Sequence, residues 1–315
     1  MSNCGTFTTF KGVSSIADDQ LLNILESNFK LYLDWSFLNI GAWFDSSINQ
    51  SGIYGTNYHS NLVLSSDPVY DDGCVWQSIR KDWVWETGVS YNSGSPINIS
   101  GIYIDNVFTT GNYIVDFPLG RVILDSPIED NSDVQINYSY RYVQTYRSSD
   151  NPWFNILQFA TYDTANKDIT RTDDGDWSIG GNARIQMPCI IIEALPRSRS
   201  RPYEIGNDNL LIEQDLAFHV LAENKNDRNK LMDILRLQQD HNIVLFDTNQ
   251  IAQNDDFPLD YNGSRKNNAK MYPNIVANYR WRTCWLKNIS LFEIDSFHPN
   301  LYRGMVRCTT EIISS

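Results

Sequence analysis

The first strong pattern of apolar residues along the chain has helical spacing. Four of them recur at three- and four-residue steps and share one face of a helix: Leu21, Leu22, Leu25 and Phe29. We predict this helix over residues 17–33, with Asp18 and Asp19 in its first turn, where the helix dipole favours acidic side chains. The apolar face of such a helix needs another element to pack against.

Between residues 42 and 147 the pattern changes to short apolar runs separated by Gly, Ser, Asn and Asp, which is typical of antiparallel β-structure. Apolar and polar residues alternate over 113–117 and again over 122–124, on either side of Pro118-Leu119-Gly120. Proline at the second position of this turn and glycine at the fourth suit a type I turn closed by a glycine bulge. We therefore predict a β-hairpin here.

A further strand in this region alternates strictly over residues 134–142. Apolar and aromatic residues face one way, and polar residues face the other: Gln135, Asn137, Ser139 and Arg141. One buried face and one solvent-exposed face are typical of a β-sandwich.

The last third of the chain predicts a compact α+β unit. Apolar runs and alternation indicate five strands: 185–194, 216–222, 243–246, 284–294 and 305–313. An amphipathic helix from about residue 226 to residue 241 carries Leu231, Ile234 and Leu235 on its apolar stripe. The polar, Gly- and Asp-rich stretch 163–181 indicates an exposed loop.

Together these elements favour an α+β fold, with a mostly antiparallel sheet, two helices on one face and an inserted all-β, sandwich-like domain. The predicted division assigns 1–41 to an N-terminal arm and helix of the α+β core, 42–147 to the inserted domain, and 148–315 to the remainder of the core. A free-standing N-terminal domain would give the same sequence pattern.

The charge balance narrows the choice of partners. The chain has 25 Lys and Arg against 38 Asp and Glu, a net charge of −13. So acidic a chain repels phosphate, which argues against a dedicated nucleic-acid binder and leaves DNA only as cargo passing through a lumen. The scattered cysteines include no CxxC pair, and no signal peptide or membrane span is visible, so we expect a cytosolic chain without a membrane partner.

Motifs for catalysis are missing. The sequence has no HExxH, GxSxG or Walker phosphate loop, and its histidines lie far apart. Three aspartates around Gly175 could coordinate Ca²⁺: Asp173, Asp174 and Asp176. The remaining ligands of a calcium loop are absent, however, and a solvated turn is favoured. We expect no catalytic residue, no cofactor and no metal. An enzyme would need carboxylates that converge only in the fold.

Aromatic residues in the β-rich segment allow two interpretations: Trp76, Trp83, Trp85 and Tyr91. Aromatics on a sheet face can stack on sugar rings, which would make the chain a carbohydrate- or receptor-binding adhesin or baseplate protein. Trp83 and Trp85 alternate on one side of a patterned strand, however, and such tryptophans are more often core. The core interpretation is favoured.

A basic stretch, Pro196 to Pro202, stands out in this acidic chain. On an extended loop stiffened by prolines at both ends, Arg197, Arg199 and Arg201 would project the same way. A solvated hairpin tip is one interpretation. The other is a contact with an acidic neighbouring copy, since the planar guanidinium suits carboxylates. With the adjacent Tyr203 and Glu204, these are the residues we expect at a subunit interface.

Two stretches resemble virion proteins of tailed bacteriophages. The first spans residues 111–140, from Gly111-Asn112-Tyr113-Ile114-Val115-Asp116 to Tyr138-Ser139-Tyr140, and is similar to small β-domains of phage head–tail and tail proteins. The second resembles the tail-terminator and tail-completion family, through residues 187–193, 203–206, 218–222, 231–235 and 243–247.

The second resemblance implies a strand–hairpin–strand–helix–strand core with the N-terminal helix beside the internal one. It also implies a homo-oligomeric, commonly hexameric ring that caps the tail tube and joins head to tail. Because family members are usually about half as long, the β-rich segment would be an extra domain. The expected setting is a virion neck or tail assembled in the host cytoplasm beside other tail, sheath or neck proteins, with a sheath cap or baseplate as open alternatives.

Overall fold

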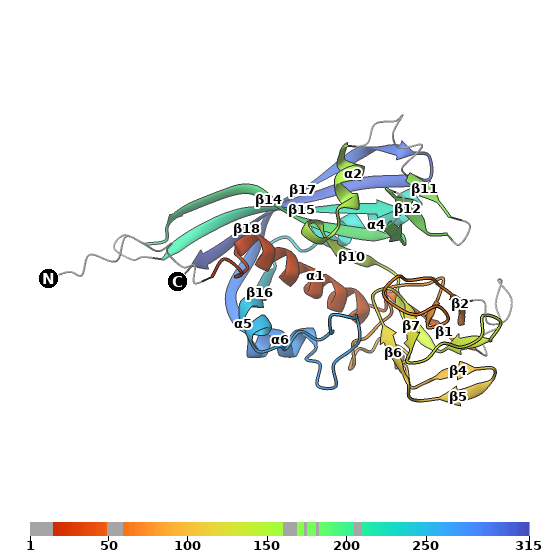
Figure 1. The fold of residues 1–315 in the computed structure, drawn as a ribbon. Coiled ribbons are helices and arrows are strands. Elements are labelled where there is room, and N and C mark those ends of the chain that lie inside the picture. The colour runs from red at the N-terminus through yellow and green to blue at the C-terminus, as the bar shows by residue number, and fades with distance from the viewer. Residues whose placement is uncertain are drawn as a thin grey trace.

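The computed structural model describes residues 15–48, 59–159, 169–172, 175–180, 183–204 and 209–314. Within them the chain is mixed α+β and mostly β, with curled, largely antiparallel sheets and a long helix, α1, lying between its two parts (Figure 1). The predicted α+β class is confirmed.

The α+β part is built on a six-stranded sheet. In spatial order its strands are β10 (Gln144–Arg147), β14 (Cys189–Pro202), β15 (Leu210–Ala222), β18 (Leu301–Ser314), β17 (Arg280–His298) and β16 (Asn242–Phe246). All neighbours pair antiparallel except β10 and β14, which are parallel. The five predicted strands are present and most are longer than expected, but the first is interrupted after Ile185 and its part in this sheet begins at Cys189. β10 joins this sheet, although its residues lie at the end of the predicted inserted domain, 42–147.

Helices α1 (Leu21–Asn39) and α4 (Lys225–Arg236) pack on the same face of this sheet, as the two apolar stripes predict. Leu25 and Phe29 of α1 share one hydrophobic core with Leu231 and Leu235 of α4. The ring of Phe29 meets that of Phe218 on β15, with centroids 5.6 Å apart. A sheet face with two apolar helix stripes against it excludes water from the central strands.

α1 starts later than predicted. Its N-cap is Gln20, so Asp18 and Asp19 precede the helix instead of occupying its first turn. The chain before the helix is held by a reciprocal pair: Asp19 N–H donates to Asn249 Oδ1 at 2.7 Å, and Asn249 Nδ2 donates to the Asp19 carbonyl at 3.0 Å. Leu22, which we expected on the apolar face, is 38% exposed.

The opposite face of the sheet is covered by α2 (Trp153–Phe159) and by a small antiparallel sheet of β11 (Ile169–Arg171), β12 (Trp177–Ile179) and β13 (Ala183–Ile185). β11 and β12 lie where the sequence predicts an exposed loop. Ile191 of β14 faces this side, whereas Ile190 and Ile192 face α1 and α4. The exposed loop predicted over 163–181 is wrong in its described part, because Trp177 is fully buried there.

Three short helices complete this part. η1 (Ser148–Asp150) follows β10, and α5 (Thr248–Gln253) and α6 (Tyr272–Asn278) lie between β16 and β17 along the chain. Phe246, Ile251 and Ile275 form a small core of their own.

The β-rich part contains a seven-stranded antiparallel sheet. Its order is β5 (Val107–Thr109), β4 (Ile102–Ile104), β8 (Val134–Ile136), β2 (Asn61–Leu64), β3 (Val75–Gln77), β7 (Arg121–Leu124) and β6 (Tyr113–Asp116). A two-stranded ribbon of β1 (Trp43–Ser46) and β9 (Tyr138–Arg141) accompanies it. The all-β character is confirmed, but among the described residues the strands form one curled sheet and a ribbon instead of two comparable stacked sheets.

The predicted hairpin is confirmed as β6 and β7, with Asp116 opposite Arg121. Gly120 closes the turn at φ +63°, and a Cβ there would lie 2.3 Å from the Arg80 carbonyl oxygen. Glycine is therefore required both by the left-handed backbone and by the close approach of another loop.

The alternation predicted over residues 134–142 holds on its apolar side and fails on its polar side. Val134, Ile136 and Tyr138 are buried as expected. Ser139 and Arg141, which we expected in solvent, are only 1% and 4% exposed. The reason is that this side of β9 lies against other parts of the protein instead of water.

α1 connects the two parts through a second apolar face. Leu31 and Trp35 pack against the core of the β-rich part, and Leu38 packs with Val84 and Val89. A helix that is apolar over most of its circumference is one that is enclosed on several sides.

Candidate subunit interface

Three strands continue beyond the helices as an arm, seen at the left of Figure 1 with the C-terminus at its end. The arm consists of residues 198–202 of β14, 210–214 of β15 and 310–314 of β18, paired in continuous antiparallel register. The loop predicted for the basic stretch is therefore wrong, because Arg197, Arg199 and Arg201 lie within β14. Alternation of Arg and Ser has the period of a strand, and this decides the conformation despite the flanking prolines.

The three arginines share one face of the arm, as expected from their spacing. Across the face, Arg201 Nη2 lies 3.2 Å from Glu213 Oε1, and Arg197 Nε lies 3.6 Å from Asp215 Oδ2. The side chains of Arg197 and Arg201 are still 61% and 65% exposed. Carboxylates of the same chain therefore only partly occupy these guanidinium groups, which leaves donors for a second partner.

A hollow of about 330 Å³ lies on this charged face, between β14 and β17. Arg197 and Arg199 line one side, Phe292 lines the other, and Asp215 and Arg307 lie between them. It contains guanidinium and carboxylate groups but no nucleophile positioned by a base. Such a lining suits charged side chains of another protein surface.

Asp215 is the fixed centre of the hollow. It is 7% exposed and accepts hydrogen bonds from Arg307 Nη2 at 2.5 Å and Thr309 Oγ1 at 2.9 Å. Burial opposes ionisation of Asp215, but these bonds and the charges of Arg307 and Arg197 outweigh it and lower its pKa below the ordinary value. The carboxylate therefore stays ionised and holds the arginines in place.

The tip of the arm carries the remaining predicted interface residues. Tyr203 is 48% exposed and its N–H donates to the Asn209 carbonyl at 2.9 Å, which continues the β14–β15 pairing. Glu204 is exposed. The last two residues of the stretch 203–206, which carries part of the resemblance, lie outside the described part of the chain.

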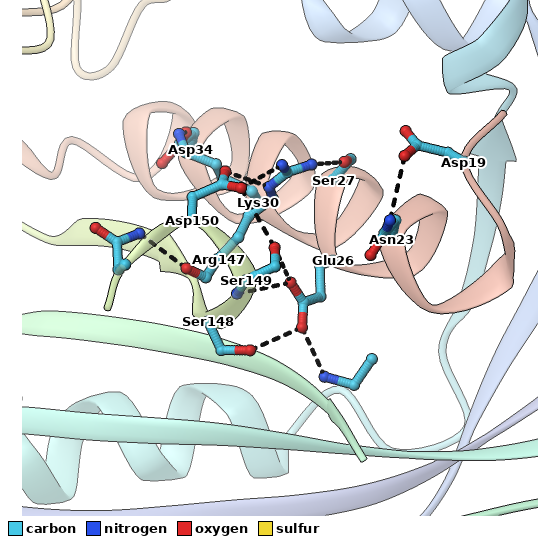
Figure 2. Close-up of polar contacts among 12 residues, drawn as sticks. Asp19, Asn23, Glu26, Ser27, Lys30, Asp34, Arg147, Ser148, Ser149 and Asp150 are labelled. Carbon is cyan, nitrogen blue, oxygen red and sulfur yellow. Dashed lines mark hydrogen bonds and ion pairs between the residues drawn. The ribbon is translucent and has the colours of Figure 1, made fainter. Parts of the chain in front are cut away.

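The base of the arm is held by Glu26 of α1, a residue that no sequence pattern singles out (Figure 2). This carboxylate is 5% exposed and accepts hydrogen bonds from Ser148 Oγ at 2.9 Å, Ser149 Oγ at 2.7 Å and the Ala194 N–H at 3.0 Å. Ala194 is the last residue before the β14–β15 register shifts. The helix thereby caps the strand where the arm begins.

Arg147 makes a second connection at the same place (Figure 2). Its guanidinium forms two hydrogen bonds of 2.6 Å with Asp150 and also donates to Ser27 Oγ of α1. The end of β10 and η1 are thus tied to α1 on the side where Glu26 holds β14.

A buried charge network lies where α1, β9 and β10 meet. Arg141 Nη2 donates to both oxygens of Glu86 at 2.7 Å, and Nε lies 3.4 Å from Asp82. Lys30 donates to Asp34 at 2.8 Å, and Thr145 also donates to Asp34. Regular alternation predicts Arg141 in solvent, so this network could not be found from local pattern.

Burial and charge act differently on the three carboxylates of this network. Burial raises the pKa of Glu86 and of Asp82 in spite of Arg141. Burial also opposes ionisation of Asp34, but Lys30 and Arg141 outweigh it and lower the pKa of Asp34. Arg141, Glu86 and Asp34 are buried in this network, which holds the two parts of the chain together.

The alternative interpretation of the aromatic residues is wrong for the three tryptophans. Trp76, Trp83 and Trp85 are 2%, 0% and 6% exposed and belong to the core of the β-rich part. The ring of Trp83 stacks on that of Tyr138 with centroids 4.4 Å apart. Of these four aromatic residues, only Tyr91, at 45% exposure, is open to a ligand.

Other candidate chemistry is sparse. Asp176 forms an ion pair with Arg184, and Asp173 and Asp174 lie outside the described residues. In the part of the chain that the structure describes, no group of three or more His, Cys, Asp or Glu side chains could hold a metal ion. No described helix has the length and apolar character to cross a bilayer.

Comparison with known proteins adds no relative: no family model, no curated protein and no solved structure matches the chain.

Proposed function

We propose that this chain is a non-enzymatic structural subunit of a tailed-phage virion that assembles with copies of itself into a ring at the neck or tail end. In this role it caps the tail tube and joins head to tail, with tail, sheath or neck proteins as its other partners. The proposal combines the terminator-like order of elements over residues 185–247 with the arm described above.

The observation that carries the proposal is the arm. It extends three strands beyond both helices and carries half-buried apolar side chains: Leu210, Leu211, Ile212 and Ile313. Ile312 of the arm joins the main core, but these four side chains remain partly exposed and gain less from packing within their own chain. The stability of the arm and its charged face both favour contact with a neighbouring subunit.

Charge supports self-association. The charged face, with Arg197, Arg199, Arg201 and Arg307 against Glu213 and Asp215, is locally basic in a chain of net charge −13. The rest of any copy is therefore acidic and attracts this face. A ring of such subunits would also present a largely acidic wall, which DNA could pass without adhering.

Light scattering on the purified protein tests the proposal. We expect a discrete multiple of the 36.3 kDa chain that persists on dilution, and we expect the protein in purified phage particles by mass spectrometry. A monomer at every concentration, together with absence from particles, would contradict it.

A further inference from the structure

The six-stranded sheet has two open edges at opposite ends of the molecule. β10 pairs with β14 only up to Ile192, so no described strand pairs with the outer edge of β14 over residues 195–202. β16 pairs with β17 only up to Trp285, so within the described residues no strand pairs with the outer edge of β17 over residues 289–294. Among the described strands, these two stretches offer backbone donors and acceptors to another chain.

On the β14 edge, the outward groups belong to the serines. Tyr203 N–H donates toward β15, and antiparallel pairing alternates, so the odd-numbered residues of the arm bond inward. The N–H and C=O groups of Ser198 and Ser200 therefore point away from the sheet. Pro202 lies at the next outward position, where its missing N–H removes no bond to β15.

On the β17 edge, the outward groups belong to Leu291 and Glu293. Leu286 exchanges backbone bonds with residues 240–241, on the side away from β18. One extra residue between Lys287 and Ser290 then reverses the alternation, so that Ser290 and Phe292 bond toward β18. The N–H and C=O groups of Leu291 and Glu293, which follow these two residues, therefore point away from β18.

The directions of β14 and β17 are compatible with antiparallel pairing between two copies of the chain. β14 and β17 are separated by three antiparallel steps, so they run in opposite directions within one sheet. If the β17 edge of one copy meets the β14 edge of the next without inversion, the new pair is again antiparallel. Because the two edges differ, the contact is heterologous, which is the type that closes rings.

The side chains of the two edges also fit one another. In the antiparallel pairing, Ser198 and Ser200 lie opposite Glu293 and Leu291, and Arg199 lies opposite Phe292, so a guanidinium meets an exposed aromatic ring. Glu293 already forms an ion pair with Arg228 of α4 at 2.7 Å. Leu291 and Phe292 are 39% and 43% exposed, and an edge with apolar side chains and no proline is open to strand addition. Small serines alternate with the arginines on β14 and leave its backbone accessible.

We infer that the partner of the β17 edge is the β14 edge of a second copy, joined by a short antiparallel ladder between Ser198–Ser200 and Leu291–Glu293. Pro202 limits this ladder to a few residues and thereby fixes its register. The inference rests on the proposed ring and specifies which surfaces form it.

Two proline substitutions test the ladder. Ser200→Pro removes an outward donor on β14, and Leu291→Pro removes one on β17, without removing any bond inside the subunit. Each should weaken association about tenfold or more, since each copy loses hydrogen bonds at an otherwise small contact. Ser200→Ala and Leu291→Ala keep the N–H and are the matched controls, with circular dichroism to confirm folding.

Mixing the two proline variants gives the sharpest result. Each variant keeps one intact edge, and these edges are complementary, so an equimolar mixture should form a heterodimer and no larger species. A ring in Ser200→Pro alone, equal to the wild type, would overturn the ladder while leaving the ring proposal standing. A wild-type monomer would overturn both.

Discussion

The arm and the buried network use the same residue types with opposite consequences. On the arm, Arg201 meets Glu213 with its guanidinium 65% exposed, so solvent screens the pair and leaves the arginine free to bind elsewhere. In the network, Arg141 meets Glu86 with both side chains 3% exposed, so each depends on the other. The degree of exposure, more than the residue type, decides whether an arginine–glutamate pair can also bind a partner or only stabilises its own chain.

The largest expected effect comes from removing the buried cation. Arg141→Met leaves Glu86 and Asp82 buried without their partner, and we expect a loss of about 3–5 kcal/mol in the free energy of unfolding. Arg201→Met on the arm is the matched control and should change it by at most about 1 kcal/mol. Urea unfolding measures both, and equal losses would contradict the contrast.

A smaller effect is expected at the base of the arm. Glu26→Gln keeps the shape of the side chain but loses the charge that accepts four hydrogen bonds, at a cost of about 1–3 kcal/mol. Amide exchange at Ala194 should accelerate, since its N–H donates to Glu26. Glu213→Gln on the arm is the control. Unchanged amide exchange at Ala194 in Glu26→Gln would show that Glu26 does not hold the base of the arm.

Glu86 of the buried network and Asp215 of the charged face should respond to pH with opposite signs. Burial raises the pKa of Glu86 above its ordinary 4.5, so the stability it contributes is fully present below pH 4.5 and is lost as pH rises through the raised pKa. The lowered pKa of Asp215 has the opposite effect, with stability present above pH 3.8 and lost as pH falls through the lowered value.

Two amide substitutions separate these contributions. Glu86→Gln should remove the loss of stability that occurs as pH rises. Asp215→Asn should remove the loss of stability that occurs as pH falls. Unfolding free energies measured in steps from about pH 3 to pH 8 give the comparison. Identical pH profiles for wild type and both variants would show that neither carboxylate is perturbed.

The smallest effect is that of salt. Raising NaCl from about 0.05 M to 0.5 M shortens the screening length and should weaken association through the exposed charged face by a few fold. The buried network is protected from ions, so the unfolding midpoint of a monomeric variant should change little. Association that strengthens with salt would indicate that apolar residues such as Phe292 dominate the contact.

Periodicity predicted much of the fold, because the apolar faces of α1, α4 and the long strands repeat at fixed spacing. It failed where a strand is too short to show a period, as in β12, or where burial depends on distant partners. Arg141 and Glu86 are 55 residues apart, and Glu26 and Ala194 are 168 apart. The arm was missed because prolines at both ends of the Arg–Ser alternation indicated a loop, although an edge strand accepts proline at outward positions.

Native mass spectrometry of the wild-type chain beside Ser200→Pro tests the assignment of the arm most directly. A single closed multiple of 36.3 kDa for the wild type and chiefly 36.3 kDa for the variant is the expected result. Closed assemblies of the same mass in both samples would contradict the assignment of the β14 edge to the subunit contact.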